Sequence, residues 1–244
     1  MNRGDVETFD SPRTAVRLTI GSPRVHFRSV DSTNECARLL AAAGAPHGTL
    51  VTASEQRAGR GRQGRTWSAP AGQGLLCSLI VREPPRLLPL AAGAAVASAA
   101  GEEARLKWPN DVLVHGRKVA GILVEGRPLQ RWAVVGMGIN VAVSIDELPP
   151  EIRDRAGTLG LPAGAIEGWL GGLVEHLAHW LEASEEEVLE AVRTRDALLQ
   201  QPVRWAGGCG TGAGIDGDGR LMVTTADGTV ALDSGEVHLV TRSR

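Results

Sequence analysis

The sequence is poor in cysteine, lysine and aromatic residues: its 244 residues include three cysteines, two phenylalanines and no tyrosine. Cys36, Cys77 and Cys209 are widely separated and form no Cys-x-x-Cys pair, which argues against a disulfide framework and a structural zinc. No apolar run approaches the ~18 residues that span a bilayer, and the N-terminus lacks the apolar core of a signal peptide. We therefore expect a soluble, cytoplasmic protein with no membrane partner.

Lysine is nearly absent. Of 26 basic residues only Lys107 and Lys118 are lysines, and both fall in one short segment. A compositional drift towards arginine explains the scarcity. A remaining lysine is, however, also typical of a site that needs a compact ammonium group rather than the planar guanidinium of arginine. The net charge of -2 gives no global attraction to nucleic acid, so anion binding has to come from local clusters.

Length and hydropathy patterning predict one sizeable core with a small appendage. Strands are expected over residues 25–30, 49–54, 75–81, 105–107, 112–114, 119–124 and 132–143, the last broken at Gly136 and Gly138, with a further short strand near 16–20. Helices are expected from Ser32 through Leu40 and over 87–100. Two amphipathic helices follow, with faces formed by Ile166, Leu170, Leu173, Leu177 and Leu181 and by Val188, Val192 and Leu199.

At Pro202 the pattern changes to short strands with glycine turns, over residues 203–205, 210–215, 221–225, 229–232 and 237–240, with a hairpin turn at 216–219. The irregular order of helices and strands predicts an α+β fold, with a mixed or antiparallel sheet and flanking helices, not a parallel doubly wound sheet. We divide the chain into an N-terminal tail (1–24), a main domain (25–199) and a β domain (200–244).

Two serines have the spacing of capping boxes, Ser32 with Glu35 and Ser184 with Glu187. As a helix N-cap, the Ser32 hydroxyl would accept a hydrogen bond from a backbone amide of the first turn. The residues alone favour this structural role for Ser32 over ligand binding.

The segment Gly59-Arg60-Gly61-Arg62-Gln63-Gly64-Arg65 places three guanidinium groups among glycines. Guanidinium forks match phosphates and carboxylates, and glycines let backbone N–H groups approach an anion. Arginine-glycine segments also occur in RNA-binding tails, but this one lies between two apolar strands and is not repeated. The pattern favours an anion-binding loop.

A second cluster is Lys107-Trp108-Pro109-Asn110-Asp111, followed by Lys118 across an expected hairpin at 115–116. Residues on the two strands of a hairpin become neighbours, so Asp111 and Lys118 are predicted to share a site. The alternative is a surface salt bridge, worth ~0–1 kcal/mol. The coincidence of both lysines with this segment favours a site.

In this combination the motifs resemble those of bacterial biotin protein ligases. Four occur in that family's order: Ser32-Thr33-Asn34, residues 56–67, residues 107–118 and Gly136-Met137-Gly138-Ile139-Asn140. The resemblance implies a catalytic domain like that of class II aminoacyl-tRNA synthetases and an SH3-like C-terminal domain. Some members carry an N-terminal winged helix that binds DNA, for which we expect no room here, and no nucleic-acid partner.

The resemblance also implies a two-step reaction. Biotin and Mg-ATP give biotinyl-5'-AMP, and a lysine of a biotin carboxyl carrier protein then takes the biotinyl group; the enzyme is expected to be a monomer or homodimer. Catalytic roles fall to Lys118, Arg62 and Asp111, with Asp111 orienting the cations or contacting magnesium. Biotin is assigned to Ser32, Thr33, Asn34, Gln56, Arg60, Gly61, Arg62, Lys118 and Gly121, and the nucleotide to Arg60, Arg62, Arg65, Trp67, Lys107, Asn110 and Asn140.

Several alternatives remain open from the residues. Trp67 and Trp108 are as typical of core anchors as of adenine platforms. A dinucleotide-binding site at 136–138 is rejected, because this segment lacks the third glycine and the following helix. The helical spacing of His176 and His179 is disfavoured as a metal site, because no third ligand lies nearby in the sequence. A lipoate or octanoate ligase is the closest rival in function, and an RNA-binding module the rival of another class. The loop 59–67, with three like charges, is predicted to be mobile without ligand.

Overall fold

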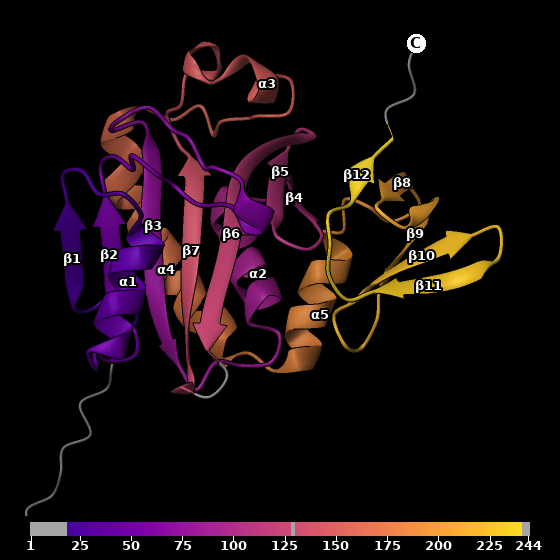
Figure 1. The fold of residues 1–244 in the computed structure, drawn as a ribbon, viewed down its shortest axis with the longest axis horizontal. Helices are drawn as coiled ribbons and strands as arrows, with labels where there is room; N and C mark the ends of the chain where they lie inside the picture. The colour runs from indigo at the N-terminus through magenta and orange to yellow at the C-terminus, as the bar shows by residue number, and fades with distance from the viewer. Residues whose placement is uncertain (1–18, 128–129, 241–244) are drawn as a thin grey trace, which may run out of the picture.

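The computed structural model describes residues 19–127 and 130–240 of the chain. Within these ranges the larger sheet has seven strands in the order β1-β2-β3-β7-β6-β5-β4 (Figure 1). The strands are β1 (Arg24–Phe27), β2 (Leu50–Ala53), β3 (Gly74–Arg82), β4 (Ala104–Lys107), β5 (Asp111–Val114), β6 (Arg117–Arg127) and β7 (Trp132–Asn140). β1 and β2 are parallel and the other neighbouring pairs are antiparallel, which confirms the mixed sheet of an α+β fold.

Helices cover both faces of this sheet. The α-helices of the described residues are α1 (Thr33–Ala42), α2 (Leu88–Ala100), α3 (Pro150–Arg153), α4 (Ile166–Glu182) and α5 (Glu185–Thr194), and α3 lies beyond the ends of the strands (Figure 1). On one face, Ala37 and Ala41 of α1 pack with Val134 of β7. On the opposite face α2 and α4 pack against each other, behind the sheet in Figure 1. α2 is apolar on nearly all sides and therefore lies buried.

The prediction that glycines break the strand over 132–143 is wrong. β7 runs without interruption from Trp132 to Asn140 and pairs along its whole length with β3. Ladder hydrogen bonds to β3 and β6 on both sides offset the weak strand preference of glycine. Since side chains alternate along a strand, Gly136 and Gly138 lie on one face, the face that α1 covers.

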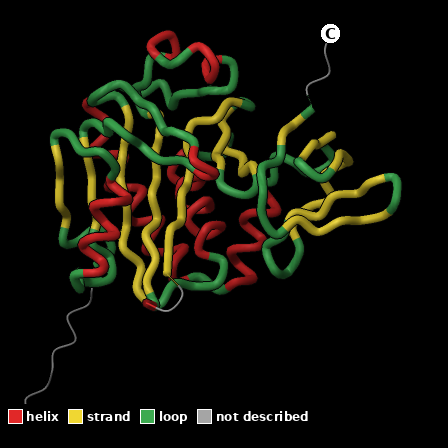
Figure 2. Tube along the Cα trace, in the orientation of Figure 1, coloured by secondary structure: helices red, strands yellow, loops and turns green. Residues whose placement is uncertain are grey.

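The C-terminal residues form a second sheet, in the order β11-β10-β9-β8-β12 (Figure 2). Its strands are β8 (Pro202–Trp205), β9 (Gly208–Ile215), β10 (Leu221–Thr225), β11 (Gly228–Leu232) and β12 (His238–Leu239). The predicted hairpin turn over 216–219 is confirmed between β9 and β10. Val223 and Val237 belong to the same buried cluster as Val192 of α5, so the two sheets are packed through a continuous apolar core.

Two local expectations have different outcomes. Most of the strand expected near 16–20 lies outside the described residues, and residues 20 and 21 form a turn. Leu199 does not extend the face of α5, because the helix ends at Thr194 and the Asp196 carboxylate accepts the Leu198 N–H, at 2.8 Å, in a turn. Leu199 is consequently exposed.

The two predicted capping boxes also have different outcomes. Ser184 and Glu187 form theirs. The Ser32 hydroxyl makes no capping hydrogen bond, and Glu35 instead pairs with Arg38 and Arg60. Among the described residues, no helix is both long and apolar enough to cross a membrane.

Candidate active site

Three glycines form the floor of a cleft on the α1 face of the large sheet. Gly121 of β6 pairs with Gly138 of β7. The Trp67 indole lies over both, so that a Cβ atom on Gly138 would overlap the ring and one on Gly121 would approach it to 3.0 Å. A Cβ on Gly136 would overlap the Asn34 carboxamide. These positions therefore need glycine because a tryptophan and an asparagine lie directly against the backbone.

The arginine-glycine segment is a hairpin that covers this floor. Gly61 N–H donates to the Arg65 carbonyl at 2.7 Å, and Trp67 N–H donates to the Gly59 carbonyl at 3.0 Å. The chain reverses at Gln63 and Gly64, both with positive φ, a conformation that glycine adopts at no steric cost. The hairpin thus carries its three arginines and Trp67 to one edge of the cleft.

The cleft is partly open to solvent. Of the residues predicted to bind substrates or act in catalysis, it is lined by Ser32, Thr33, Asn34, Gln56, Arg60, Gly61, Arg62, Arg65, Trp67, Lys107, Asn110, Asp111, Lys118 and Gly121. Asn140 does not line it. Its Nδ2 donates to the Gly157 carbonyl at 2.8 Å, near the end of β7.

The Asp111 carboxylate lies between the two lysines of the chain. Lys118 Nζ is 2.6 Å from Asp111 Oδ1, and Lys107 Nζ is 3.5 Å from Asp111 Oδ2. Cross-strand register brings them together, because Asp111 begins β5 opposite Lys107 of β4 and Lys118 returns on β6. The Asp111 side chain is only 16% exposed, so the pairing predicted from the hairpin lies within the cleft rather than on an open surface.

Burial shifts the ionisation of two cations around Asp111. It lowers the pKa of Lys107, an effect that Asp111 opposes and the neighbouring Lys118 reinforces. Burial also lowers the pKa of Arg62, again against the attraction of Asp111. Arg62 Nη1 donates to Asn110 Oδ1 at 3.1 Å, and Asn110 Nδ2 donates to the Ile122 carbonyl at 3.1 Å. The guanidinium is thereby directed towards the lysine–aspartate cluster.

Lys118 also contacts an aromatic ring. Its ammonium lies 5.6 Å from the centroid of the Trp67 ring, within the range of a cation–π interaction. One ammonium is thus held by a carboxylate on one side and an indole on the other, while its side chain remains 32% exposed to the cleft.

A chain of neutral polar groups lines the end of the cleft next to α1. Gln56 Oε1 accepts hydrogen bonds from Thr33 N–H (2.7 Å) and Thr33 Oγ1 (3.0 Å). Ser78 Oγ lies 2.8 Å from Thr33 Oγ1 and 2.6 Å from Asn34 Oδ1. The Ser32 hydroxyl, free of any capping role, is beside them in the cleft lining.

The other two arginines of the hairpin pair with carboxylates. Arg60 lies 3.2 Å from Glu35 Oε2 and 3.3 Å from Glu125 Oε1. Arg65 pairs with Glu236, which precedes β12 in the C-terminal sheet and lines the same cleft. Each positive charge of the hairpin therefore has a polar or acidic partner in the protein.

Sequence reasoning missed three of these partners: Ser78, Glu125 and Glu236. Ser78 had a detectable signal, since it is a polar residue inside the apolar strand β3 and is fully buried. Glu125 follows a run of apolar β6 residues, and Glu236 lies in the distant loop between β11 and β12. Neither has a local pattern that points to the cleft.

Within the part of the chain that the structure describes, three buried side-chain atoms have no hydrogen-bond partner: Trp67 Nε1, Asn140 Oδ1 and Asp196 Oδ2. A buried polar atom without a partner costs free energy, so each calls for an explanation. Trp108, in contrast, is a core anchor: its ring is buried and its Nε1 donates to the Gly219 carbonyl at 3.0 Å.

In the described ranges no group of three or more His, Cys, Asp or Glu side chains is placed to hold a metal ion.

Comparison with known proteins identifies relatives of this chain. The model of the biotin/lipoate A/B protein ligase family matches residues 26–141. The bifunctional ligase/repressor BirA of Bacillus subtilis is 33% identical over 247 residues, covering 90% of this chain and 75% of the relative. The biotin--[acetyl-CoA-carboxylase] ligase of Mycobacterium tuberculosis is 34% identical over 234 residues, covering 85% and 86%.

Solved structures show the same likeness. The biotin protein ligase from Aquifex aeolicus, in complex with biotin and ATP, has a TM-score of 0.77 and 30% identity to this chain. The match covers 89% of this chain and 99% of that one.

Proposed function

Because the chain belongs to the biotin/lipoate A/B protein ligase family, we propose that its cleft joins the carboxyl group of biotin to the α-phosphate of ATP. The products of this step are biotinyl-5'-AMP and pyrophosphate. In a second step a lysine of a biotin carboxyl carrier protein attacks the mixed anhydride and releases AMP. The relatives are biotin ligases by name, which favours biotin over lipoate or octanoate.

One observation carries this proposal: Arg62 and Lys118, from segments 56 residues apart, line a single cleft around Asp111. Joining a carboxylate to a phosphate brings two anions together, so the site must supply cations in fixed positions. Lys118 and Arg62 supply them. Asp111 holds the Lys118 ammonium in place before the anions arrive, which limits reorganisation during the reaction.

We assign the ureido ring of biotin to the polar end of the cleft beside α1. The ring needs both hydrogen-bond donors and acceptors, and a site tailored to them rejects analogues that lack those groups. Ser32 and Gln56 Nε2 have capacity left for a ligand, and Thr33 holds Gln56 in orientation. Backbone groups near Arg60, Gly61 and Gly121 complete this end.

We assign the nucleotide to the Trp67 side of the cleft. Trp67 Nε1 and Asn140 Oδ1 are a buried donor and a buried acceptor without partners among the described residues. An acceptor on the edge of a purine would satisfy Trp67 Nε1. Asn140, which does not line the cleft, would support the nucleotide side from two residues beyond Gly138 on the same strand face. Lys107, Asn110 and Arg65 line the part of the cleft that the phosphates would reach.

Magnesium is proposed to enter with ATP. Both oxygens of Asp111 already face ammonium groups, so this carboxylate fits the role of orienting cations better than that of a metal ligand. Mg²⁺ usually keeps several waters and binds through substrate phosphates with few protein ligands. The waters and the phosphates of ATP could therefore complete its coordination in the cleft.

The domain assignment follows the same comparison. We propose that residues 25–199 form a catalytic domain of the class II synthetase type and that residues 200–244 form an SH3-like domain. The small five-stranded sheet beginning at Pro202 supports this division. Glu236, in the loop before β12, contributes to the cleft lining, so the C-terminal unit takes part in the proposed site.

The test is biotin-dependent exchange of labelled pyrophosphate into ATP by the purified protein. Only an enzyme that activates biotin reversibly gives exchange that requires biotin. Exchange supported by lipoate or octanoate, but not by biotin, would overturn the assignment. Transfer to a carrier is tested separately, by mass spectrometry of a purified biotin carboxyl carrier protein after incubation.

A further inference from the structure

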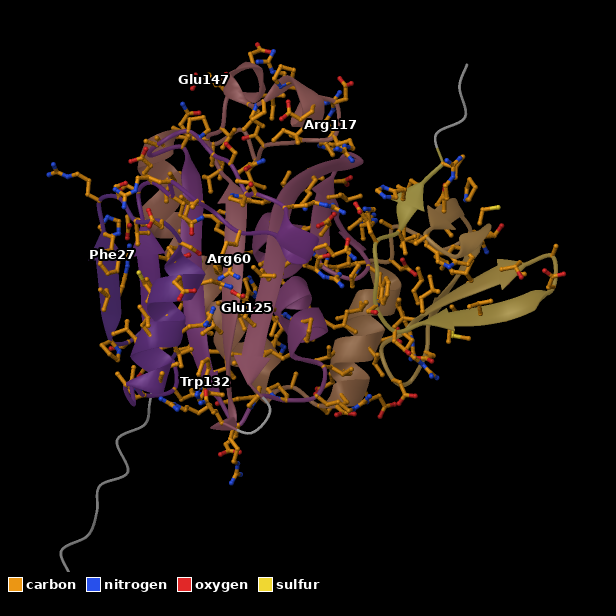
Figure 3. The ribbon with its side chains drawn as sticks, viewed as in Figure 1. Phe27, Arg60, Arg117, Glu125, Trp132 and Glu147 are labelled. Atoms are coloured by element: carbon orange, nitrogen blue, oxygen red, sulfur yellow. The ribbon has the colours of Figure 1, made fainter. Side chains whose placement is uncertain are left out.

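Glu125 holds two parts of the cleft at once. It follows Gly121 and Leu123 on the α1 face of β6, and its side chain is 22% exposed. One oxygen, Oε2, accepts a hydrogen bond from Asn34 Nδ2 at 2.9 Å. The other, Oε1, lies 3.3 Å from Arg60 Nη2. Figure 3 shows Arg60 and Glu125 beside each other over the middle of the large sheet.

The Asn34 amide is fully committed inside the protein. Its Nδ2 donates to Glu125 and to the Leu123 carbonyl, at 2.9 and 3.3 Å, and its Oδ1 accepts from Ser78. The residue is 3% exposed. Asn34 therefore transmits the position of Glu125 to Ser78 and, through Ser78 and Thr33, to Gln56.

Arg60 is the point at which the hairpin 59–67 is fixed to the rest of the molecule on this side. It pairs with Glu35 of α1 as well as with Glu125 of β6. Glu35 is 44% exposed against 22% for Glu125. Because solvent screens exposed pairs, the less exposed contact with Glu125 is the stronger constraint on the hairpin.

We propose that Glu125 is a positioning residue that couples closure of the hairpin 59–67 to the polar groups that receive the ureido ring of biotin. This proposal rests on the proposed function for the identity of the ligand. A ligand that orders Gln56 and Thr33 also orders Asn34, because Ser78 connects Thr33 to Asn34. Asn34 in turn holds the Glu125 carboxylate in the position at which it pairs with Arg60. Closure of the hairpin is thereby tied to occupancy of the biotin end of the cleft.

Three variants separate the two contacts of Glu125. Glu125→Ala removes both, and Glu125→Gln keeps an oxygen that can accept from Asn34 but loses the charge that Arg60 needs. Glu35→Gln weakens the second anchor of Arg60, together with the pair between Glu35 and Arg38. Hydrogen exchange over residues 59–67 measures hairpin closure, and pyrophosphate exchange gives KM for biotin and kcat. Thermal unfolding of each variant establishes that it is folded.

For Glu125→Ala we expect KM for biotin to rise about tenfold or more, as for loss of a charge-assisted hydrogen bond, and hairpin exchange to become fast with and without biotin. Glu125→Gln should keep KM for biotin within about threefold while its hairpin exchange rises, because only the charge-dependent contact is lost. Glu35→Gln should raise hairpin exchange less than Glu125→Gln does and, because coupling is reciprocal, should raise KM for biotin by a correspondingly smaller factor.

The proposal is overturned if folded Glu125→Ala keeps native KM for biotin and native hairpin protection. It is also overturned if Glu35→Gln raises KM for biotin as much as Glu125→Ala does, since among the described residues the Glu35 side chain makes no hydrogen bond to the Asn34 amide. The hydrogen-exchange measurement on ligand-free protein does not depend on activity. A failure of biotin activation is thus distinguishable from a failure of the Glu125 contact.

Discussion

The Lys118 ammonium and the Asp111 carboxylate, seven residues apart in the sequence, meet at 2.6 Å across the hairpin between β5 and β6. Lys107 approaches the same carboxylate from β4. One negative charge is therefore surrounded by both lysines of the chain and faces Arg62 across the cleft. This arrangement holds cations at the place where the proposed chemistry brings two anions together, and the following predictions depend on it.

Replacing Lys118 should damage chemistry far more than stability. We expect Lys118→Ala to lower the rate of biotin-dependent pyrophosphate exchange by about 100-fold or more, because a cation at the reacting centre is lost. The free energy of unfolding should fall by about 1 kcal/mol or less, as for a partly exposed ion pair. Arg131→Ala, which removes the exposed pair with Glu83, is the matched control and should retain full exchange. Unchanged adenylation in folded Lys118→Ala would refute the assignment.

The pH dependence of stability should reveal the burial of Lys107. Because burial lowers its pKa, the folded protein gives up this proton below the ordinary value of 10.5. The unfolded chain binds more protons in that window, so this residue makes stability rise as the pH rises towards 10.5. In urea unfolding at about pH 8, 9 and 10, the free energy of unfolding of the unsubstituted protein should increase relative to that of Lys107→Met as the pH rises. Parallel pH profiles for the two proteins would contradict the prediction.

A methyl group on the cleft floor should displace Trp67. Gly138→Ala places a Cβ against the indole, and we expect a loss of about 1–3 kcal/mol of stability through overpacking, together with a raised KM for ATP. Gly168→Ala is the control, since a Cβ at that position in α4 meets nothing within 4 Å. In a helix that substitution should stabilise by up to about 1 kcal/mol. Equal effects of the two substitutions on KM would count against nucleotide binding beside Trp67.

The hairpin 59–67 should close on its ligands. Its arginines are held by Glu35, Glu125, Asn110 and Glu236, and biotin with ATP adds anions that attract the same charges. We expect amide hydrogen exchange over residues 59–67 to slow when biotin and Mg-ATP are added together. Exchange in β3 should be the same in both states. Identical exchange of the hairpin with and without ligands would rule out this closure.

Cys77 and Cys209 should differ sharply in the reactivity of their thiols. Burial raises the pKa of the Cys77 thiol to about 12, and Cys77 is 1% exposed, whereas Cys209 is exposed. Iodoacetamide at neutral pH should label Cys209 first and Cys77 only after unfolding, because the thiolate is the nucleophile. Peptide mass spectrometry of native and urea-treated protein provides the measurement. Labelling of Cys77 in the folded protein at the rate of Cys209 would show that β3 is not buried as described.

The sequence predicted which residues share the cleft where those residues lie close together in the chain. The arginine-glycine hairpin, the Lys107–Asp111 segment and the return of Lys118 were identified because a loop or a hairpin brings their residues together within a short stretch of chain. Gly136 and Gly138 belong to one of the motifs that carry the family resemblance but were misjudged as strand breakers, since glycine preference says little about a strand that is paired on both sides.

Other parts were beyond local patterns. Ser32 has the spacing of a capping box, but its helix begins where the polar side chains of Thr33 and Asn34 engage Gln56, Ser78 and Glu125 instead. The partners of Arg60 and Arg65 come from α1, β6 and the C-terminal sheet. No periodicity or spacing links such distant segments.

The sequence by itself determined the elements and the chemical groups, because strand alternation, helix periodicity and turn residues act over a few neighbouring positions. Only the tertiary structure decided which groups meet. The sheet order placed β6 and β7 side by side under the hairpin 59–67, and the packing of the second sheet brought Glu236 to Arg65. Those contacts arise from the burial of apolar surface distributed over the whole chain, and the identity of a charged residue does not reveal which partner that burial will bring to it.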